Sequence, residues 1–240
     1  MKFKIIPSLA YLSLLPVLLM LGMWQLDRSE QKRALLKLQE QAVATEMLHL
    51  SADIEDKTDA LRYRQIEVVG RYDVAHQFLI DNQISGGKAG YYVLTPLVLT
   101  GETKAVLVNR GWIPLNQDRS ILPDLQINKV QATITGRINH FPSVGIKLAG
   151  AEIPTAAWPS VVQVVDSDVL AEKLGYLLFQ FQLELDKELP DGFKREWHAS
   201  TVMLPEQHTA YAIQWFGLAL TLTILFIWYS FKNNDAQSKK

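Results

Sequence analysis

Two long apolar runs without a charged residue constrain the fold of this chain most. They cover residues 5–26 and 210–231, and each is about 22 residues long. A helix of that length rises about 33 Å at 1.5 Å per residue, which is enough to cross the hydrocarbon layer of a bilayer. The mean hydropathy of +0.04 is high for a soluble protein, and the excess lies in these runs. The sequence therefore predicts two transmembrane helices, with residues 27–209 between them.

The first run has some features of a cleaved signal peptide. Lys2 and Lys4 resemble the basic leader of such a peptide. The run is nevertheless long for a leader core, and bulky residues (Met20, Leu21 and Met23) stand where a cleavage site needs small ones. We therefore interpret the run as an uncleaved membrane anchor.

The charges beside the two runs indicate the orientation only weakly. Lysines lie outside both runs, but basic residues also follow the first run directly. Because a long domain between two spans can cross the membrane largely regardless of its own charge, we expect residues 1–4 and 232–240 to be cytoplasmic and residues 27–209 to be extracytoplasmic. Aromatic residues at the ends of the runs suit the membrane interfaces: Trp24, Tyr211, Trp215, Trp228 and Tyr229.

The composition excludes several kinds of protein. The chain has no cysteine, so it forms neither disulfides nor thiolate metal sites such as those of copper-delivery proteins. Its formal net charge of -1 argues against binding to nucleic acid. The N-terminus also lacks the Arg- and Ser-rich amphipathic leader of an imported mitochondrial protein, which favours a bacterial plasma (inner) membrane.

The central part shows two hydrophobic patterns in turn. Directly after the first run, a helical spacing predicts a short amphipathic helix that Ser29 is placed to cap. From Tyr63 onward the period changes toward two, in segments rich in β-branched and aromatic residues. The clearest segment, residues 179–186, is predicted to be a strand with one buried and one wet face, preceded by a helix that Ser167 caps. We therefore predict an α+β membrane protein: two transmembrane helices flanking an antiparallel β-rich extracytoplasmic domain, barrel-like or sandwich-like, with short marginal helices.

The usual catalytic signatures are missing. The sequence has no HExxH, FPSVGIK lacks the leading glycine of a nucleophile elbow, and the glycines of ISGGKAGY do not have P-loop spacing. The sequence therefore indicates that the protein is not an enzyme, with a membrane-anchored hydrolase of unrecognised type as a remote alternative. Four histidines lie in or beside loops or strand ends without metal-site spacing, and we expect them to be solvated or locally hydrogen-bonded: His49, His76, His140 and His198.

The fifth histidine, His208, differs in its position. Pro205 suits the first position of a helix and Glu206 suits the first turn, so we expect the second transmembrane helix to begin there. His208 then lies in the first turn, where the positive end of the helix dipole favours a neutral imidazole. A neutral imidazole is the form that binds a metal ion.

The face of the helix that carries His208 allows two interpretations. Ala212, Trp215 and Ala219 lie on the same side at helical spacing. A face with two small residues and an aromatic one would admit a flat apolar ligand, with iron held from the membrane surface. Alternatively, His208 anchors the helix at the interface while the small residues pack against the first span.

Five stretches of the sequence, in this order, resemble one protein family. They are GMWQLDRSEQK, YRQIEVVGRYD, GYYVLTPLVL, VLVNRGWIP and HTAYAIQWFGLAL, and they extend from Gly22 to Leu220 between two terminal spans. Together they resemble the surfeit locus protein family in its bacterial type, whose members are membrane proteins that assist the assembly of haem-copper cytochrome oxidases. Residues 143–160 match no part of this pattern.

This resemblance implies a role in maturing subunit I of the oxidase. Bacterial members of the family are thought to bind haem a and to help pass it from haem a synthase to the oxidase, with the histidine before a YAxQWF-like motif as ligand of the iron. In this sequence that histidine is His208. The resemblance leaves open whether the client uses cytochrome c or quinol, the haem type, the second axial ligand and the oligomeric state.

Further residues are expected to contribute to the same site. Some share the face of His208, some pack near the haem end of the second helix, and two arginines suit bidentate pairing with the haem propionates: Ala212, Trp215, Trp24, Gln25, Arg28 and Arg110. We therefore expect a haem-handling assembly factor. The alternative is a scaffold of the same family that binds subunit I through its membrane helices and β domain but never holds haem.

Overall fold

The structure, a computed structural model, describes residues 5–43, 45–54, 58–143, 148–197 and 203–238. Its chain forms two compact units, one of Met1–Lys37 with His198–Lys240 and the other of Leu38–Trp197. We call the first the helical unit and the second the β domain, and we describe each by itself.

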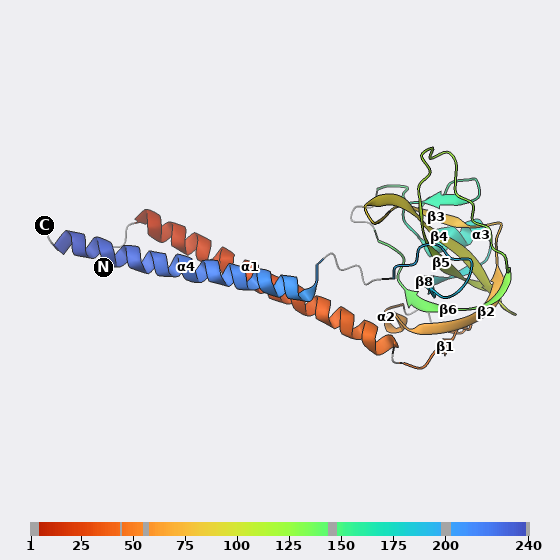
Figure 1. The fold of residues 1–240 in the computed structure, drawn as a ribbon, viewed down its shortest axis with the longest axis horizontal. Coiled ribbons are helices and arrows are strands. Elements are labelled where there is room, and N and C mark those ends of the chain that lie inside the picture. The colour runs from red at the N-terminus through yellow and green to blue at the C-terminus, as the bar shows by residue number, and fades with distance from the viewer. Residues whose placement is uncertain (1–4, 44, 55–57, 144–147, 198–202, 239–240) are drawn as a thin grey trace. The chain divides into compact units, whose positions relative to one another are not determined.

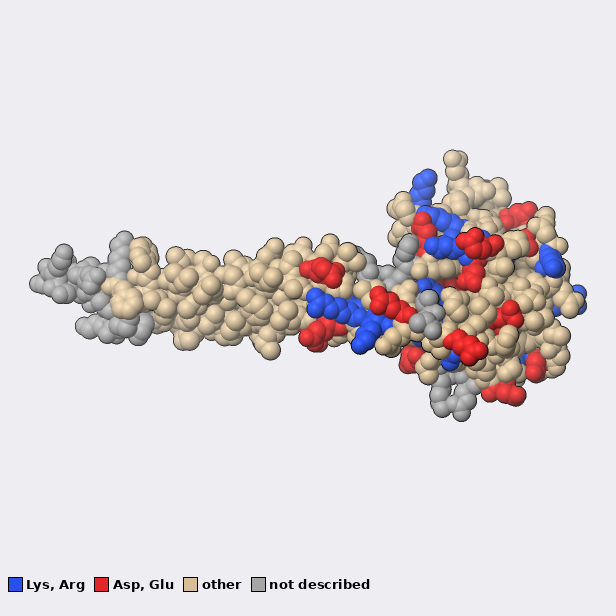
Figure 2. Space-filling view, turned by 60° about the horizontal axis from the view of Figure 1, so that its bottom comes forward, with Lys and Arg blue, Asp and Glu red and all other residues tan. Residues whose placement is uncertain are grey.

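The helical unit is built from two long helices, α1 (Ile5–Val43) and α4 (Pro205–Ser238) (Figure 1). Both are long and apolar enough to cross a membrane. Figure 2 shows that the surface of the pair is tan over most of its length and that charged side chains gather near one end. In the sequence of α1 the charged residues all follow the apolar run, and α4 has an acidic residue in its first turn: Asp27, Arg28, Glu30, Lys32, Arg33, Lys37, Glu40 and Glu206. Both apolar runs are therefore helical, as predicted, and α4 begins at Pro205 as expected.

Helix α1 does not stop at the end of its apolar run. It continues unbroken through Ser29 to Val43, so the prediction of a separate amphipathic helix capped by Ser29 is wrong. A serine caps a helix when its own backbone leaves helical geometry. Here the residues that follow are mostly good helix formers, such as Glu, Gln, Lys, Arg, Ala and Leu, so the helix propagates through the boundary between apolar and charged sequence.

The two helices pack antiparallel through one stripe on each. At one end the rings of Tyr11 and Phe226 stack with centroids 4.3 Å apart, and the Tyr11 hydroxyl lies 3.2 Å from Oγ1 of Thr223. Along each helix, the other contact residues are mostly spaced by three or four residues, or by sums of these numbers. Such spacing keeps them on one side of the helix, as in a coiled coil. The contact residues are Tyr11, Gly22, Gln25 and Ser29 on α1 and Pro205, His208, Thr209, Phe216, Thr223 and Phe226 on α4.

The β domain contains eight strands and two short helices (Figure 1). In chain order they are β1 (Leu48–His49), α2 (Thr58–Leu61), β2 (Gln65–Tyr72), β3 (Phe78–Ser85), β4 (Lys88–Leu99), β5 (Lys104–Pro114), β6 (Gln131–Asn139), β7 (Ser160–Val162), α3 (Ser167–Leu174) and β8 (Leu177–Leu185).

Five of these strands close into a barrel. The sheet order is β1-β2-β6-β8-β5-β4-β3-β7, and an additional pairing of β2 with β4 joins β2, β6, β8, β5 and β4 in a ring. The predicted barrel-like, β-rich domain is therefore confirmed. Three pairings are parallel, β1 with β2, β3 with β7 and β5 with β8, so the sheet is mixed and not purely antiparallel. Closure of the ring leaves its strands without free edges.

The main core fills this ring. It contains Ile66 and Val68 of β2, Val106 and Val108 of β5, and apolar residues of the other three strands. In β8 the predicted alternation holds on the core side: Phe179, Phe181, Leu183 and Leu185 are all buried.

The opposite face of β8 was predicted to be wet, and this is only partly right. Gln180 is exposed, but Gln182 and Glu184 are buried. Asn109 donates a hydrogen bond to Gln182, and Arg137 pairs with Glu184. Because β8 lies between two other strands of the ring, neighbouring side chains cover both of its faces there.

Helix α3 has a cap one residue earlier than predicted. The side chain of Asp166, not Ser167, accepts hydrogen bonds from the backbone N–H groups of Asp168 and Val169. Ser167 instead pairs with Gln180. Gly175 ends the helix with a φ of 79°, a left-handed conformation that glycine adopts without strain.

Candidate functional site

His208 lies in the first turn of α4, as its position after Pro205 predicted. Its side chain is largely buried, with 8% of the residue exposed. Proline begins a helix well because its fixed φ is helical and its missing N–H has no partner in the first turn anyway. The local sequence therefore places the imidazole at the start of α4, beside the stripe that contacts α1.

Gln25 of α1 is the hydrogen-bond partner of His208. The distance from Oε1 of Gln25 to Nδ1 of His208 is 2.7 Å. An amide oxygen only accepts, so Nδ1 carries a proton and donates it in this arrangement. In the neutral ring the other nitrogen, Nε2, then presents a lone pair, and it has no hydrogen-bond partner among the described residues.

The small residues that follow His208 belong to the interface between the helices. Ala212 is fully buried, and Ala219 is 3% exposed. Between them, the Phe216 ring packs directly against the backbone of α1 at Gly22, where it leaves no room for a Cβ atom. The interpretation in which small residues pack against the first span therefore describes Ala212 and Ala219 well, and neither offers an open surface to a ligand.

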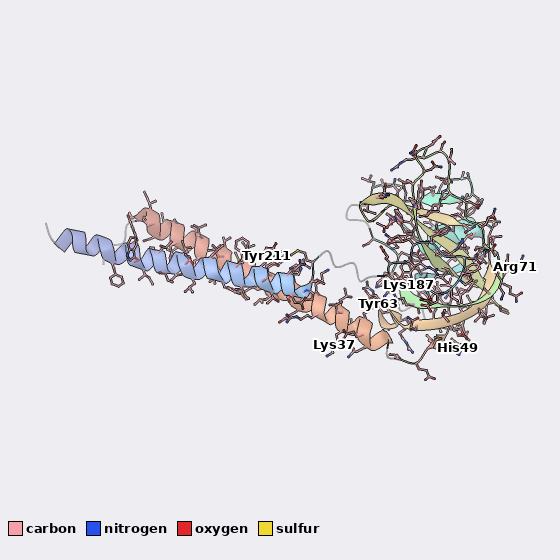
Figure 3. All side chains as sticks on the ribbon, viewed as in Figure 1. Lys37, His49, Tyr63, Arg71, Lys187 and Tyr211 are labelled. Carbon is pink, nitrogen blue, oxygen red and sulfur yellow. The ribbon has the colours of Figure 1, made fainter. Side chains whose placement is uncertain are left out.

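Three other predicted site residues are more exposed than Ala212 and Ala219: Trp24, Arg28 and Trp215. Trp24 is 49% exposed, and the guanidinium carbon of Arg28 lies 5.7 Å from the centre of its ring. Arg28 also donates to Gln31 within the same helix. Trp215 is half-buried and follows His208 by seven residues, which places it on the same side of α4. Tyr211, labelled in Figure 3, lies on α4 one turn after Gln207.

Ser29 is an interhelical contact that the sequence patterns did not reveal. It is 2% exposed, and its hydroxyl donates to the carbonyl oxygen of Pro205 at 2.9 Å and lies 3.0 Å from Oγ1 of Thr209. Arg33 donates to the same Thr209 oxygen. The separation of four residues between Gln25 and Ser29 is the signal that would have placed both on one face of α1.

Arg110 lies inside the β domain, and its guanidinium is occupied by that domain. It is 1% exposed and donates to the carbonyl oxygens of Asp191, Leu125 and Gln126 and to the side chain of Gln77. Burial lowers the pKa of this guanidinium from its usual value, and the surrounding acceptors hold it in place. No exposed face of the group is left for a propionate, so we do not carry Arg110 into the proposed site.

The other described histidines have local partners, as the sequence suggested. Nδ1 of His76 is 2.8 Å from Asp73, and Nε2 of His140 is 3.0 Å from Asp59. His49, on β1, has a largely exposed side chain beside Glu67 (Figure 3). His198 lies outside the described residues. Within the described residues no group of three or more His, Cys, Asp or Glu side chains has an arrangement that would hold a metal ion.

The β domain also has a groove on its surface. It has a volume of about 540 Å³ and is lined by Gln65, Thr135, Arg137, Asp186, Lys187, Glu188, Leu189 and Trp197. The charged centre of the groove is already paired, because Arg137 bonds to Glu184 and to the carbonyl oxygen of Trp197. The other charged residues that line the groove are Asp186, Lys187 and Glu188.

The chain is similar to known proteins along most of its length. The sequence model of the SURF1 family matches residues 12–220. A SURF1-like protein of Rickettsia conorii is 28% identical over 219 residues, which cover 89% of this chain and 86% of that protein. Surfeit locus protein 1 of Rattus norvegicus is 24% identical over 225 residues, 87% of this chain and 70% of the relative.

The name of a yeast relative refers to the assembly of cytochrome oxidase. The cytochrome oxidase assembly protein SHY1 of Saccharomyces cerevisiae is 26% identical over 105 residues, 43% of this chain and 26% of that protein. The family is not one of enzymes, in agreement with the lack of a catalytic signature in the sequence. Since the family match extends from α1 through the β domain into α4 and covers far more than half of the residues, the chain belongs to the SURF1 family.

Proposed function

We propose that this protein is an assembly factor for haem-copper cytochrome oxidase that binds haem a and assists its insertion into subunit I. Membership of the SURF1 family and the name of the yeast relative support the role in oxidase assembly. The observation that carries the haem part is the state of His208, whose Nδ1 is bonded to Gln25 while its Nε2 is free among the described residues.

The residues around His208 suit a haem in their chemistry. A ligating histidine typically donates its second ring N–H to a neighbouring acceptor, as Nδ1 of His208 does to Gln25. His208 would bind the iron through Nε2, and Trp215 and Trp24 supply flat apolar surface nearby along the helices. Arg28 is exposed and suits a propionate. The haem is the cargo in this role, so the protein contributes binding and orientation and no covalent step.

The proposed setting is a bacterial plasma membrane with both helices spanning it. Residues 1–4 and 232–240 would lie in the cytoplasm and the β domain outside it, where it would meet subunit I and haem a synthase. The lysines outside both spans support this orientation, although basic residues also follow the first span. A reporter enzyme that works only outside the cytoplasm, fused after Lys240, should be inactive, and the same reporter fused at Gly87 in the β3–β4 turn should be active. The reverse pattern would overturn the orientation.

A scaffold that binds subunit I without haem is the second candidate function. The burial of Ala212 and Ala219 and the close approach of Gly22 to Phe216 favour it, because they give these small residues a packing role that needs no ligand. In this alternative His208 and Gln25 would join the helices at the membrane interface and do nothing further.

An absorption spectrum separates the two candidates. The protein, co-produced with the enzymes of haem a synthesis and purified in detergent, should carry haem a, and His208→Ala should lose it. His76→Ala is the matched control, since His76 is bonded to a carboxylate in the β domain, and it should keep the haem. Haem absent from the wild type, or retained in His208→Ala, would reject ligation by His208. Copurification of subunit I with His208→Ala is expected in both cases.

A further inference from the structure

Gln25 is a polar residue at the end of an otherwise apolar segment. It lies between Trp24 and Leu26, within the first uncharged run, and is half-buried. A primary amide in such surroundings costs free energy unless its polar atoms have partners. Its side-chain oxygen has one partner, Nδ1 of His208 at 2.7 Å. The amide oxygen is therefore placed where a contact across the helix pair satisfies it.

The positions of Gln25 and His208 are held from both sides along the helices. One turn toward the apolar end, Phe216 fills the space left by Gly22. One turn toward the charged end, the Ser29 hydroxyl bonds to Pro205 and lies beside Thr209. These contacts determine both the distance and the register of the two helices at the level of the imidazole, which a well-placed hydrogen bond requires.

The direction of this hydrogen bond decides which ring nitrogen is free. With Oε1 toward the ring, the proton lies on Nδ1 and Nε2 has a lone pair. With the amide reversed, Nδ1 would accept and the proton would lie on Nε2, which then cannot bind a metal without losing it. The state of Gln25 therefore controls the availability of the ligating atom.

We propose that Gln25 is a positioning residue that holds His208 in its Nδ1-protonated form and thereby reserves Nε2 for the haem iron. This inference rests on the proposed function, because it assigns a role to Gln25 in haem binding. It also predicts that the acceptor strength at position 25 adjusts the electron donation of the ring to the iron, since a stronger acceptor makes the imidazole a more basic ligand.

Three variants of the full chain test the proposal. Gln25→Leu removes the acceptor at similar size, and Gln25→Glu keeps an acceptor and strengthens it. Gln41→Leu is the control, because it makes the same change at an exposed position of α1 far along the helix from the imidazole. Each variant is measured in detergent in two states. Nitrogen-15 NMR of histidine-labelled protein without haem reports the protonated ring nitrogen, and titration with haem a reports the affinity and the reduction potential.

The expected results separate positioning from a merely structural role. Wild type, Gln25→Glu and Gln41→Leu should show His208 protonated on Nδ1, and Gln25→Leu should shift the proton toward Nε2. Gln25→Leu should bind haem a about 10-fold more weakly and at a higher reduction potential, since loss of an outer-shell partner costs about 10- to 100-fold in affinity. Gln25→Glu should bind haem a about as tightly as the wild type does. Its reduction potential should be lower than that of the wild type.

Two outcomes would overturn the inference, and they differ from failure of the proposed function. If wild-type His208 is protonated on Nε2, or if Gln25→Leu leaves the tautomer, the affinity and the potential unchanged, Gln25 does not position the ring even though His208 binds haem. If the wild-type protein binds no haem a at all, the proposed function itself fails and the role of Gln25 fails with it.

Discussion

Gly22 of α1 and Phe216 of α4 are in such close contact that a Cβ atom on Gly22 would lie 2.5 Å from Cε1 of the phenyl ring. Gly22 lies one turn before Gln25 on α1, and Phe216 lies about two turns after His208 on α4. Lipid tails are as apolar as the side chains, so association of membrane helices depends on close packing of this kind. The absent side chain of Gly22 is therefore a requirement for the pairing of α1 and α4.

A side chain at position 22 should weaken that pairing. Gly22→Val should force the helices apart. The free energy of helix association should become less favourable by about 1–3 kcal/mol, the usual range for overpacking. Gly217→Val is the matched control, because nothing among the described residues lies within 4 Å of a Cβ built there. Cysteines introduced at positions 11 and 223 of this cysteine-free chain would report the pairing through their rate of disulfide formation. An equal rate in Gly22→Val and the wild type would contradict the prediction.

Removal of the Arg110 guanidinium should destabilise the β domain strongly. Arg110→Ala removes a donor from the carbonyl oxygens of Leu125, Gln126 and Asp191, although the Leu125 oxygen still accepts from Gln77. An unsatisfied buried acceptor costs about 1–3 kcal/mol, and partly exposed acceptors cost less. We therefore expect a loss of about 1–3 kcal/mol, measured by hydrogen exchange of the β5 amides in the full chain.

The control for this substitution is Arg119→Ala. The Arg119 side chain is 62% exposed and lies 4.0 Å from Asp81, so its loss should change stability by less than about 0.5 kcal/mol. Comparable hydrogen exchange in the two variants would show that the buried network of Arg110 is not needed for the domain. Retention of haem a by a folded Arg110→Lys protein would agree with our exclusion of this residue from the site.

The stability of the β domain should fall in strongly alkaline solution because of Tyr72. Burial raises the pKa of its phenol from 10.0 to about 12, with Arg110 lowering it in part. A raised folded-state pKa means that the folded protein holds the proton more tightly than the unfolded chain does. The shift therefore adds about 2–3 kcal/mol at most to the free energy of unfolding. This stabilisation is complete below pH 10 and is lost as the pH rises from 10 to 12.

The variant Tyr72→Phe isolates this effect. The free energy of unfolding should decline less between pH 10 and 12 in Tyr72→Phe than in the wild type. Burial also raises the pKa of Tyr176 and of Tyr92, so both proteins retain some decline. Parallel curves for the two proteins over this interval would show that the Tyr72 phenol titrates alike in folded and unfolded chains.

Replacing one member of the buried pair of Arg137 and Glu184 should destabilise the protein more than replacing both. Arg137→Met leaves a carboxylate that is almost fully buried with only Asn139 as a donor, which should cost about 3–5 kcal/mol. The double variant Arg137→Met, Glu184→Leu removes both charges and should recover most of the loss. Thermal unfolding of the four proteins of this cycle measures the coupling. A double variant as unstable as the sum of the single ones would contradict the expectation.

Much of the helical unit could be predicted because local sequence determines it. An uncharged run of about 22 residues must be helical to satisfy its own backbone in a membrane. Pro205 places the start of α4 through its fixed φ. The alternation from Phe179 to Leu185 likewise identified a strand and its core-facing side, because successive side chains of a strand point to opposite faces.

The sequence alone misplaced features that depend on distant neighbours. Ser29 was expected to begin a helix, but α4 supplies the partners of its hydroxyl from 176 and 180 residues away. Glu184 was expected to face water, but the pairing of β6 with β8 places Arg137 directly opposite it. Arg110 was expected near a propionate, which stays an untested prediction; its guanidinium bonds to Gln77, Leu125 and Asp191 inside the β domain.

The candidate site likewise combines features set by local sequence with features set by distant contacts. The sequence by itself determined that His208 stands at the start of an apolar helix, because proline, an acidic first turn and the apolar run are all local signals. Only the tertiary structure decided that Gln25, 183 residues away, bonds to Nδ1 and leaves Nε2 free. The physical reason is that a helix face is a local property of the chain, whereas the hydrogen-bond partner of a buried ring depends on which helix packs against it and in what register.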